Sequence, residues 1–142
     1  MESVKIYLSG GISNLSKEEQ SGWRNRFKDA IKFGDHDLIK TPIFFDPTQY
    51  YSIFIPEHNS EREVMDFDLY NLRNSDLVVV NFNDPKSIGT AMELAIANER
   101  KIPVIGLVKH GVKLHPWLSE SCIRICDSFA ELAKYVVKYY LT

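Results

Sequence analysis

Short, almost wholly apolar runs recur along this chain. The clearest are residues 4–10 (VKIYLSG), 75–82 (SDLVVVNF) and 102–108 (IPVIGLV). A strand with apolar side chains on both sides must be covered on both faces of its sheet, as the strands of parallel sheets are. These runs therefore predict the buried strands of a parallel sheet.

The segments between these runs carry helix signals. Ser16 followed by Glu19 is a capping-box pattern, and apolar residues then repeat at helical spacing as far as Gly34. The same spacing predicts three further helices, over residues 59–74, over residues 87–99 and in the segment that Ser128 caps. Helices thus separate the strands along the chain.

Two further segments are weaker strand candidates. Residues 37–45 (DLIKTPIFF) read as a strand, although Pro42 cannot donate to a sheet ladder, and residues 122–126 (CIRIC) add a short one. Residues 46–60 form an irregular stretch rich in proline and aromatic side chains, and loops of this length are often functional.

Strands that alternate with helices imply right-handed crossovers, with helices on both faces of a parallel sheet. We therefore predict an α/β fold: one doubly wound domain of the flavodoxin-like or Rossmann-like type over residues 1–142, with roughly five parallel strands. A chain of 142 residues has the length of one such domain.

Charge and cysteine content exclude several kinds of partner. The formal net charge is −2, without a basic stripe for nucleic acid or a polybasic helix for a membrane surface. Cys122 and Cys126 have no second pair at zinc spacing and the histidines fit no metal template, so we expect free thiols and no metal. No apolar run suits a signal peptide or a membrane span. We expect a soluble cytoplasmic protein.

The predicted site lies at the carboxyl ends of the strands, where open parallel sheets bind ligands. Gly10 and Gly11 end the first strand and let backbone approach a ligand, although two such glycines are often only turn geometry. The helix that starts near Ser87 and Gly89 presents free N–H groups to an anion. The phosphate-loop and dinucleotide glycine patterns are absent, which disfavours those classes.

Glu93 lies among apolar residues in SIGTAMELAIANE (87–99). An ionised carboxylate is costly to bury alone, so it needs partners, a shifted pKa or access to water. It is either an acid stabilised by the helix dipole or a group that faces a cleft. Tyr7 is a candidate that could equally be a core residue, and Asp68 one that could be a solvated helix position. Spacing alone assigns these residues no reaction.

Three patterns together resemble one family. They are Tyr7-x-x-Gly10, D-L-x(6)-D-x-x-V-V beginning at Asp68, and S-x-G-x-x-x-E-L from Ser87 to Leu94. The chain resembles the nucleoside 2-deoxyribosyltransferase family, whose superfamily includes the Rcl-type deoxynucleoside 5′-monophosphate N-glycosidases. The resemblance extends over nearly the whole chain in element order.

The resemblance implies a double displacement at the anomeric carbon of a nucleoside or nucleotide. Glu93 would attack C1′ and form a covalent glycosyl ester, as the nucleophile of a retaining glycosidase does. Asp68 would protonate or orient the departing base, and the Tyr7 hydroxyl would keep Glu93 ionised and aimed. This chemistry needs no metal or organic cofactor.

Ser87 bears on the choice of substrate. Base-exchanging transferases typically carry aspartate at this position, whereas the monophosphate N-glycosidases carry a serine that helps to hold the 5′-phosphate. An aspartate would repel a phosphate dianion, so Ser87 favours a nucleotide. Transfer and hydrolysis both stay open. The residues expected to contact substrate are Gly10, Gly11, Ser87 and Gly89, with Ser9, Ser13 and Arg24 as further phosphate candidates.

Members of the family commonly build each site at a dimer contact, which the neighbour's C-terminal region completes. Residues 115–121 (HPWLSES) occupy that place here, with Ser119 and Ser121 as candidate donors, and Trp117 could instead be core. We therefore expect a homodimer or a larger homo-oligomer.

Two other functions are compatible with this sequence. One is a nucleotide-binding sensor module without turnover, since fold does not fix function, although the set Tyr7, Asp68 and Glu93 argues against it. The other is an NAD-glycohydrolase-type enzyme, which also uses a glutamate in a flavodoxin-like fold. Nothing in the sequence specifically favours NAD.

Overall fold

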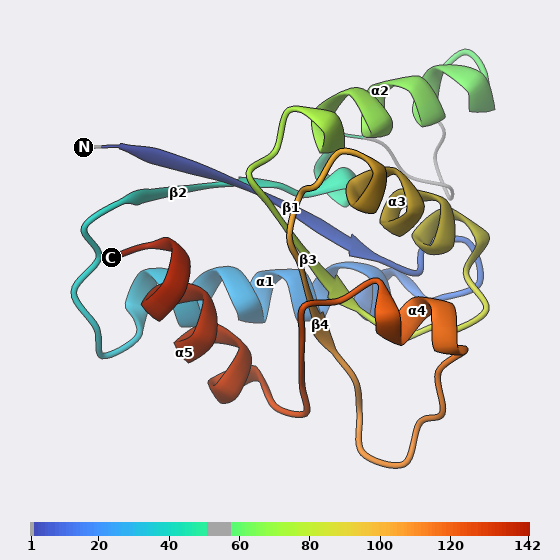
Figure 1. Cartoon of the computed structure of the whole chain (residues 1–142). Coiled ribbons are helices and arrows are strands. Elements are labelled where there is room, and N and C mark those ends of the chain that lie inside the picture. Colours follow the sequence, from blue (N-terminus) through green and yellow to red (C-terminus); the bar gives the residue numbers. More distant parts are fainter. Residues whose placement is uncertain (1, 51–57) are drawn as a thin grey trace.

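The computed structural model describes residues 2–50 and 58–142 (Figure 1). Helices and strands alternate along most of the chain, as the sequence predicts. In chain order the elements are β1 (Ser3–Gly10), α1 (Lys17–Phe33), β2 (Thr41–Phe45), the 3-10 helix η1 (Pro47–Gln49), α2 (Glu61–Arg73), β3 (Leu77–Asn81), α3 (Ile88–Glu99), β4 (Val104–Leu107), α4 (Pro116–Glu120), β5 (Arg124–Cys126) and α5 (Phe129–Tyr140).

In the described part of the chain the five strands form one parallel sheet in the order β2-β1-β3-β4-β5. Helices α1 and α5 pack together on one face of the sheet, and α2 and α3 cover the other (Figure 1). The predicted doubly wound α/β fold is therefore confirmed. From β1 the chain continues to β2 on one side of the sheet and then to β3 on the other side, so the strand order reverses between β1 and β3. Folds of this kind bind ligands at the carboxyl ends of the strands on either side of such a reversal.

Strand β1 divides its side chains between two cores. Val4, Ile6 and Leu8 pack against α1 and α5, whereas Tyr7 belongs to the core beneath α2 and α3. Side chains alternate along a strand, so Ser9 points to the same face as Tyr7. The topology thus brings two hydroxyl groups of β1 under α3.

Most predicted elements are found close to their expected bounds. The capping box of α1 is present at Ser16 and Glu19, and Gly34 follows its last turn. Serine caps also precede α2, α3 and α5. The turn predicted to end β3 is present at residues 83–86. These are local signals, which a sequence displays directly.

Three predictions need correction. The strand expected over 37–45 begins only at Thr41, and Pro42 is tolerated because β2 lies at the sheet edge. The strand expected over 122–126 is shortened to Arg124–Cys126, and α4 and η1 were not predicted. Within the predicted irregular stretch 46–60, η1 occupies the beginning, and residues 51–57 lie outside the described residues.

Two further observations bear on the expectations from composition. Over residues 2–50 and 58–142, no helix is both long and apolar enough to cross a membrane. Cys122 and Cys126 are free thiols, as predicted, and burial raises the pKa of Cys122 to about 12. Its sulfur therefore stays protonated and unreactive near neutral pH.

Candidate active site

Glu93 projects from α3 toward the two hydroxyl groups of β1. The Tyr7 hydroxyl donates a hydrogen bond to Glu93 Oε2, and Ser9 Oγ donates to Glu93 Oε1 at 2.8 Å. Tyr7 and Ser9 are fully buried, whereas Glu93 is half-buried. Each oxygen of the carboxylate thus has a donor, which explains how an acidic side chain is tolerated on this apolar helix.

The surroundings of Glu93 also set its charge. Burial raises the pKa of Glu93 to about 7, against the hydrogen bonds from Tyr7 and Ser9, which lower it. Among weaker contributions, the Asp68 carboxylate raises this pKa and the Arg24 guanidinium lowers it. The carboxylate is therefore ionised above about pH 7 and poorly hydrated, which suits a nucleophile.

Glu93 opens into a pocket of about 440 Å³, within the usual size range of small-molecule sites. The turn after β1, one face of α2 and the N-terminus of α3 form its walls. Of the residues predicted from sequence, those that line it are Gly10, Ser13, Asp68, Ser87, Gly89 and Glu93. Both candidate carboxylates therefore face the same space, and Asp68 is half-buried there.

The N-terminus of α3 forms the polar end of this pocket. Ser87 caps the helix, and its Oγ accepts hydrogen bonds from Thr90 N at 3.2 Å and Thr90 Oγ1 at 2.9 Å. Because Ser87 accepts both bonds, its own proton is left for an acceptor in the pocket. A Cβ at Gly89 would meet no atom within 4 Å, so the backbone is open there. These groups can hold an anion.

Gly11 holds the turn after β1, and its predicted contact with substrate stays a prediction. It is not among the described residues that line the pocket, and its N–H donates to Asn83 Oδ1 at 3.0 Å. A Cβ at Gly11 would lie 2.7 Å from Asp84 Cβ, so the turn itself requires glycine. The close packing of the turn after β1 against the loop after β3 therefore explains why residue 11 is glycine.

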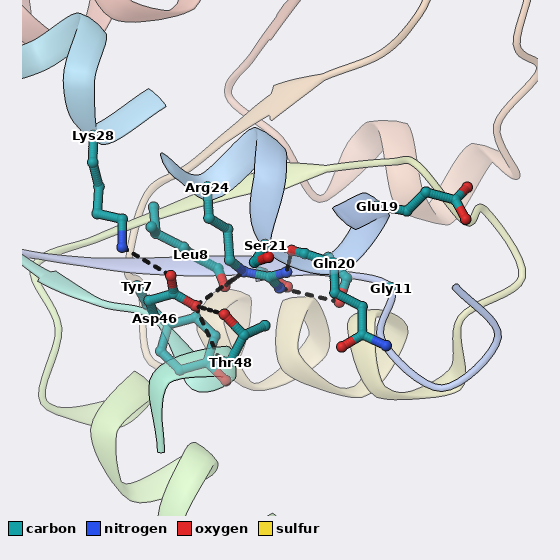
Figure 2. Close-up of polar contacts among 12 residues, drawn as sticks. Tyr7, Leu8, Gly11, Glu19, Gln20, Ser21, Arg24, Lys28, Asp46 and Thr48 are labelled. Atoms are coloured by element: carbon teal, nitrogen blue, oxygen red, sulfur yellow. Dashed lines mark hydrogen bonds and ion pairs between the residues drawn. The ribbon is translucent and has the colours of Figure 1, made fainter. Parts of the chain in front are cut away.

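Arg24 and Ser9 also lie outside the described lining of the pocket. Arg24 is fully buried and donates to the carbonyl oxygens of Leu8 and Gly10, so it does not line the pocket as a phosphate ligand would (Figure 2). Ser9 lies deep in the site, but it binds Glu93. Of the three further phosphate candidates, Ser13 lines the pocket.

Residues 115–121 contribute nothing to the pocket of their own chain as far as it is described. The Ser119 hydroxyl donates to Pro116 O at 3.0 Å, and Ser121 Oγ donates to Trp117 O at 2.6 Å. Trp117 is 81% exposed, so it is not a core residue of the single chain. A role for Ser119 in binding substrate needs a second copy of the chain and stays a prediction.

Sequence reasoning missed several lining residues. Helix α2 supplies Val64, Met65 and Leu69 to the wall around Asp68, and Lys86 stands beside Ser87. The helical period from Asp68 would have found Val64 and Met65, since positions three and four residues away share its face, whereas Leu69 is its chain neighbour and does not follow from that period. Lys86 is exposed, and its position next to a helix cap is a usable signal for an anion site.

The described residues include no group of three or more histidine, cysteine, aspartate or glutamate side chains placed to hold a metal ion. The polar groups of the pocket are hydroxyls, backbone N–H groups, one lysine, the Asn14 amide and four carboxylates, which belong to Glu61, Asp68, Asp84 and Glu93. This set can bind an anion at one end and present a nucleophile and an acid at the other.

Comparison with known proteins places this fold. No protein-family model matches the chain, and no curated protein matches its sequence. Among solved structures, a conserved protein from Enterococcus faecalis V583 has a TM-score of 0.78 at 18% identity, over 96% of this chain and 98% of that one.

Two further solved structures are of proteins with stated activities. A 2-deoxyribosyltransferase from Bacillus psychrosaccharolyticus has a TM-score of 0.70 at 17% identity, over 93% of this chain and 92% of that one. The CMP N-glycosidase BcmB of Clostridium botulinum has a TM-score of 0.57 at 15% identity, over 95% and 99%. The chain therefore shares its fold with enzymes that act on N-glycosidic bonds, as the sequence resemblance implies.

Proposed function

We propose that this protein cleaves the N-glycosidic bond of a 2′-deoxynucleoside or its 5′-monophosphate through a covalent glycosyl ester of Glu93. The observation that carries this proposal is the placement of Glu93, which two hydroxyl donors aim into a pocket that Asp68 also lines. The fold shared with a 2-deoxyribosyltransferase and a CMP N-glycosidase supports it.

In the first step, a carboxylate oxygen of Glu93 attacks C1′ of the sugar. The new C1′–O bond forms as the C1′–N bond breaks, and the bonding electron pair leaves with the base nitrogen. Asp68, in its protonated form, gives a proton to the departing base. The anionic Glu93 also stabilises the positive charge that develops on the sugar in the transition state.

In the second step, the ester is broken by a second nucleophile. Water gives the free sugar, and a second base gives a new nucleoside; either attacks C1′, and the ester electron pair returns to Glu93. The proton lost by the attacking water or base goes to the Asp68 carboxylate, which restores the starting state. Transfer requires only that the ester survive until a base arrives.

Product analysis tests this function. The protein is incubated with each deoxynucleoside and each 5′-monophosphate, with and without free adenine, and the products are separated by chromatography. We expect free base in every productive mixture and a new adenine nucleoside or nucleotide if the protein transfers. Absence of base release, with ligand-induced thermal stabilisation retained, would instead identify a binding module; release of nicotinamide from NAD would identify a glycohydrolase.

The N-terminus of α3 favours a 5′-monophosphate, and Ser87→Asp tests this preference. Aspartate caps helices as well as serine does, so α3 stays intact while a negative charge enters the pocket. We expect kcat/KM for the monophosphate to fall about tenfold to a hundredfold, since like charges a few ångströms apart repel. The value for the unphosphorylated deoxynucleoside should change little.

Ser87→Ala is the matched control, because it removes the hydroxyl without adding charge. We expect its effect on the monophosphate to be smaller than that of aspartate. An equal loss for both substrates in Ser87→Asp would show that this helix end does not hold the phosphate.

We also propose that the protein acts as a homodimer in which the partner copy brings the region of Ser119 to the pocket. Ile88 and Met92 on α3, and Trp117 on α4, expose 77%, 43% and 81% of their surfaces, and exposed apolar groups of this size commonly mark interfaces. Light scattering after gel filtration should give twice the chain mass of 16.4 kDa. Trp117→Glu should give monomers, and Tyr139→Glu on α5, 59% exposed, is the control.

A further inference from the structure

The edge strand β2 is shorter than its neighbour β1. It pairs with β1 only as far as Phe45, opposite Tyr7, whereas β1 continues to Gly10 along β3. Glu2 O accepts from Thr41 N on the β2 side, and carbonyls alternate in direction along a strand. The carbonyl groups of Leu8 and Gly10 therefore point toward the space beyond the end of β2.

Arg24 fills that space from α1 (Figure 2). Its Nε donates to Leu8 O at 3.3 Å and its Nη2 donates to Gly10 O at 3.4 Å, while Nη1 donates to Gln20 O. Two carbonyls on the same side of a strand suit the rigid donor fork of a guanidinium. The side chain of Arg24 thus continues the hydrogen bonding of β2 along the last residues of β1.

Asp46 balances the charge of Arg24. The Asp46 carboxylate is 1% exposed; its Oδ1 lies 3.7 Å from Arg24 Nε, and its Oδ2 accepts from Lys28 Nζ at 2.9 Å. Thr48 N and Thr48 Oγ1 donate to Asp46 Oδ1 at 3.0 and 2.6 Å. Figure 2 shows the carboxylate between the two cations. These bonds fix Asp46, which a buried ion pair requires.

The same groups lie next to both hydroxyl donors of the nucleophile. Ser9 stands between the two carbonyls that Arg24 binds, and its hydroxyl reaches Glu93. Asp46 directly follows Phe45, whose ring stacks on the Tyr7 ring at 5.2 Å. A shift of this unit would therefore move Tyr7 and Ser9 together, although Arg24 and Asp46 themselves lie outside the described lining of the pocket.

We propose that Arg24 and Asp46 form a positioning unit, which takes the place of the missing length of β2 and holds Tyr7 and Ser9 where their hydroxyls bind Glu93. The catalytic part of this inference rests on the proposed function. Neither residue needs to touch the substrate, so the unit acts on turnover and not on binding.

The pKa of Glu93 is a measurement that distinguishes this positioning role from a purely structural one. Tyr7 and Ser9 from β1 contact Glu93, and the charged residues that line its pocket are Glu61, Asp68, Asp84 and Lys86. Arg24 acts on Glu93 from outside the pocket lining, and its cation and the two hydrogen bonds lower the pKa of Glu93. Removing the cation and loosening the hydroxyls both raise this pKa. The pH at which Glu93 ionises must then move upward.

The test compares Arg24→Gln and Arg24→Lys with the wild type. Arg26→Gln, on the exposed side of the same helix, is the matched control. The first readout is the ionisation of Glu93, followed through the ¹³C shift of its labelled side-chain carboxyl during a pH titration, which requires no turnover. The second is kcat and KM for base release across pH, with circular dichroism to verify folding.

For the wild type we expect activity to fall below about pH 7 as Glu93 takes up a proton. Arg24→Gln should raise the Glu93 midpoint by about one pH unit and lower the plateau kcat about tenfold, with KM nearly unchanged. Arg24→Lys keeps the charge without the fork, so it should shift the midpoint less while still lowering kcat. Arg26→Gln should match the wild type.

A wild-type midpoint and wild-type kcat in Arg24→Gln would overturn the inference. If that variant does not fold, Thr48→Val loosens Asp46 without unpairing a charge and should shift the midpoint in the same direction by a smaller amount; an unchanged midpoint there would equally overturn it. If the wild type releases no base, the proposed function fails, and the carboxyl titration still decides whether Arg24 and Asp46 position the donors of Glu93.

Discussion

Glu93→Gln is expected to lower kcat for base release on the order of 10⁴-fold, the scale seen when a nucleophile is removed from a preformed site. Glutamine has almost the same shape and can still contact the Tyr7 and Ser9 hydroxyls that bind Glu93. Its amide, however, neither attacks C1′ nor carries the charge that stabilises the sugar cation. The measurement is single-turnover release of base from the best deoxynucleotide substrate.

Three controls accompany this variant. Glu99→Gln changes an exposed glutamate at the end of the same helix and should keep full activity. Thermal stabilisation by substrate should persist in Glu93→Gln, because the pocket walls are unchanged. Mass spectrometry of the quenched wild type should detect a sugar bound to Glu93. Retention of more than about a tenth of the wild-type rate in Glu93→Gln or Glu93→Ala would contradict the assignment.

The fold could be predicted from sequence because its strongest signals are local. Continuous apolar runs marked β1, β3 and β4, and serine residues marked the starts of α1, α3 and α5. The beginning of β2 could not be predicted in this way. Ile39 N and Lys40 N donate to Leu141 O, at the other end of the chain, and pairing with β1 starts only at Thr41. An apolar pattern does not reveal where the partner strand begins.

In the candidate site, too, local patterns could be predicted and contacts between distant residues could not. Glu93, Asp68 and the cap at Ser87 follow from spacing and resemblance, and the structure places all three on one pocket. Ser9 lies two residues after Tyr7 on β1, so its side chain points to the same face of the sheet. Once β1 is assigned, the sequence therefore predicts that Ser9 lies on the side of Glu93. Its bond to Glu93 joins residues 84 apart in the chain, a separation that no periodicity reports.

Arg24 shows most clearly what a sequence conceals. It lies on α1 between Trp23 and Phe27, where a cationic residue in an amphipathic helix is normally assigned to solvent or to an anionic ligand. Its partners include two carbonyls of β1 and a carboxylate that follows β2. Burial of a charge becomes predictable only when the element that supplies the counter-charge has been placed beside it.

Asp46→Asn is expected to lower the free energy of unfolding by about 3–5 kcal/mol, the usual result of removing one partner from a buried ion pair. Asparagine keeps the shape but removes the carboxylate charge that pairs with Arg24 and Lys28, whose side chains are 0% and 11% exposed. Urea unfolding followed by circular dichroism measures the change. Glu18→Gln, which breaks the exposed pair with Arg26, is the control and should change it by under about 1 kcal/mol.

A double-variant cycle separates the charge from the loss of packing. Lys28→Met removes one of the two cations, so adding it to Asp46→Asn should recover part of the lost stability. By itself, Lys28→Met should destabilise the protein, because Asp46 then keeps Arg24 as its one cationic partner among the described ion pairs. If the two losses of stability simply add, Asp46 stabilises the protein through its hydrogen bonds with Thr48. Its role would then be to cap η1, not to neutralise the buried charges of Arg24 and Lys28.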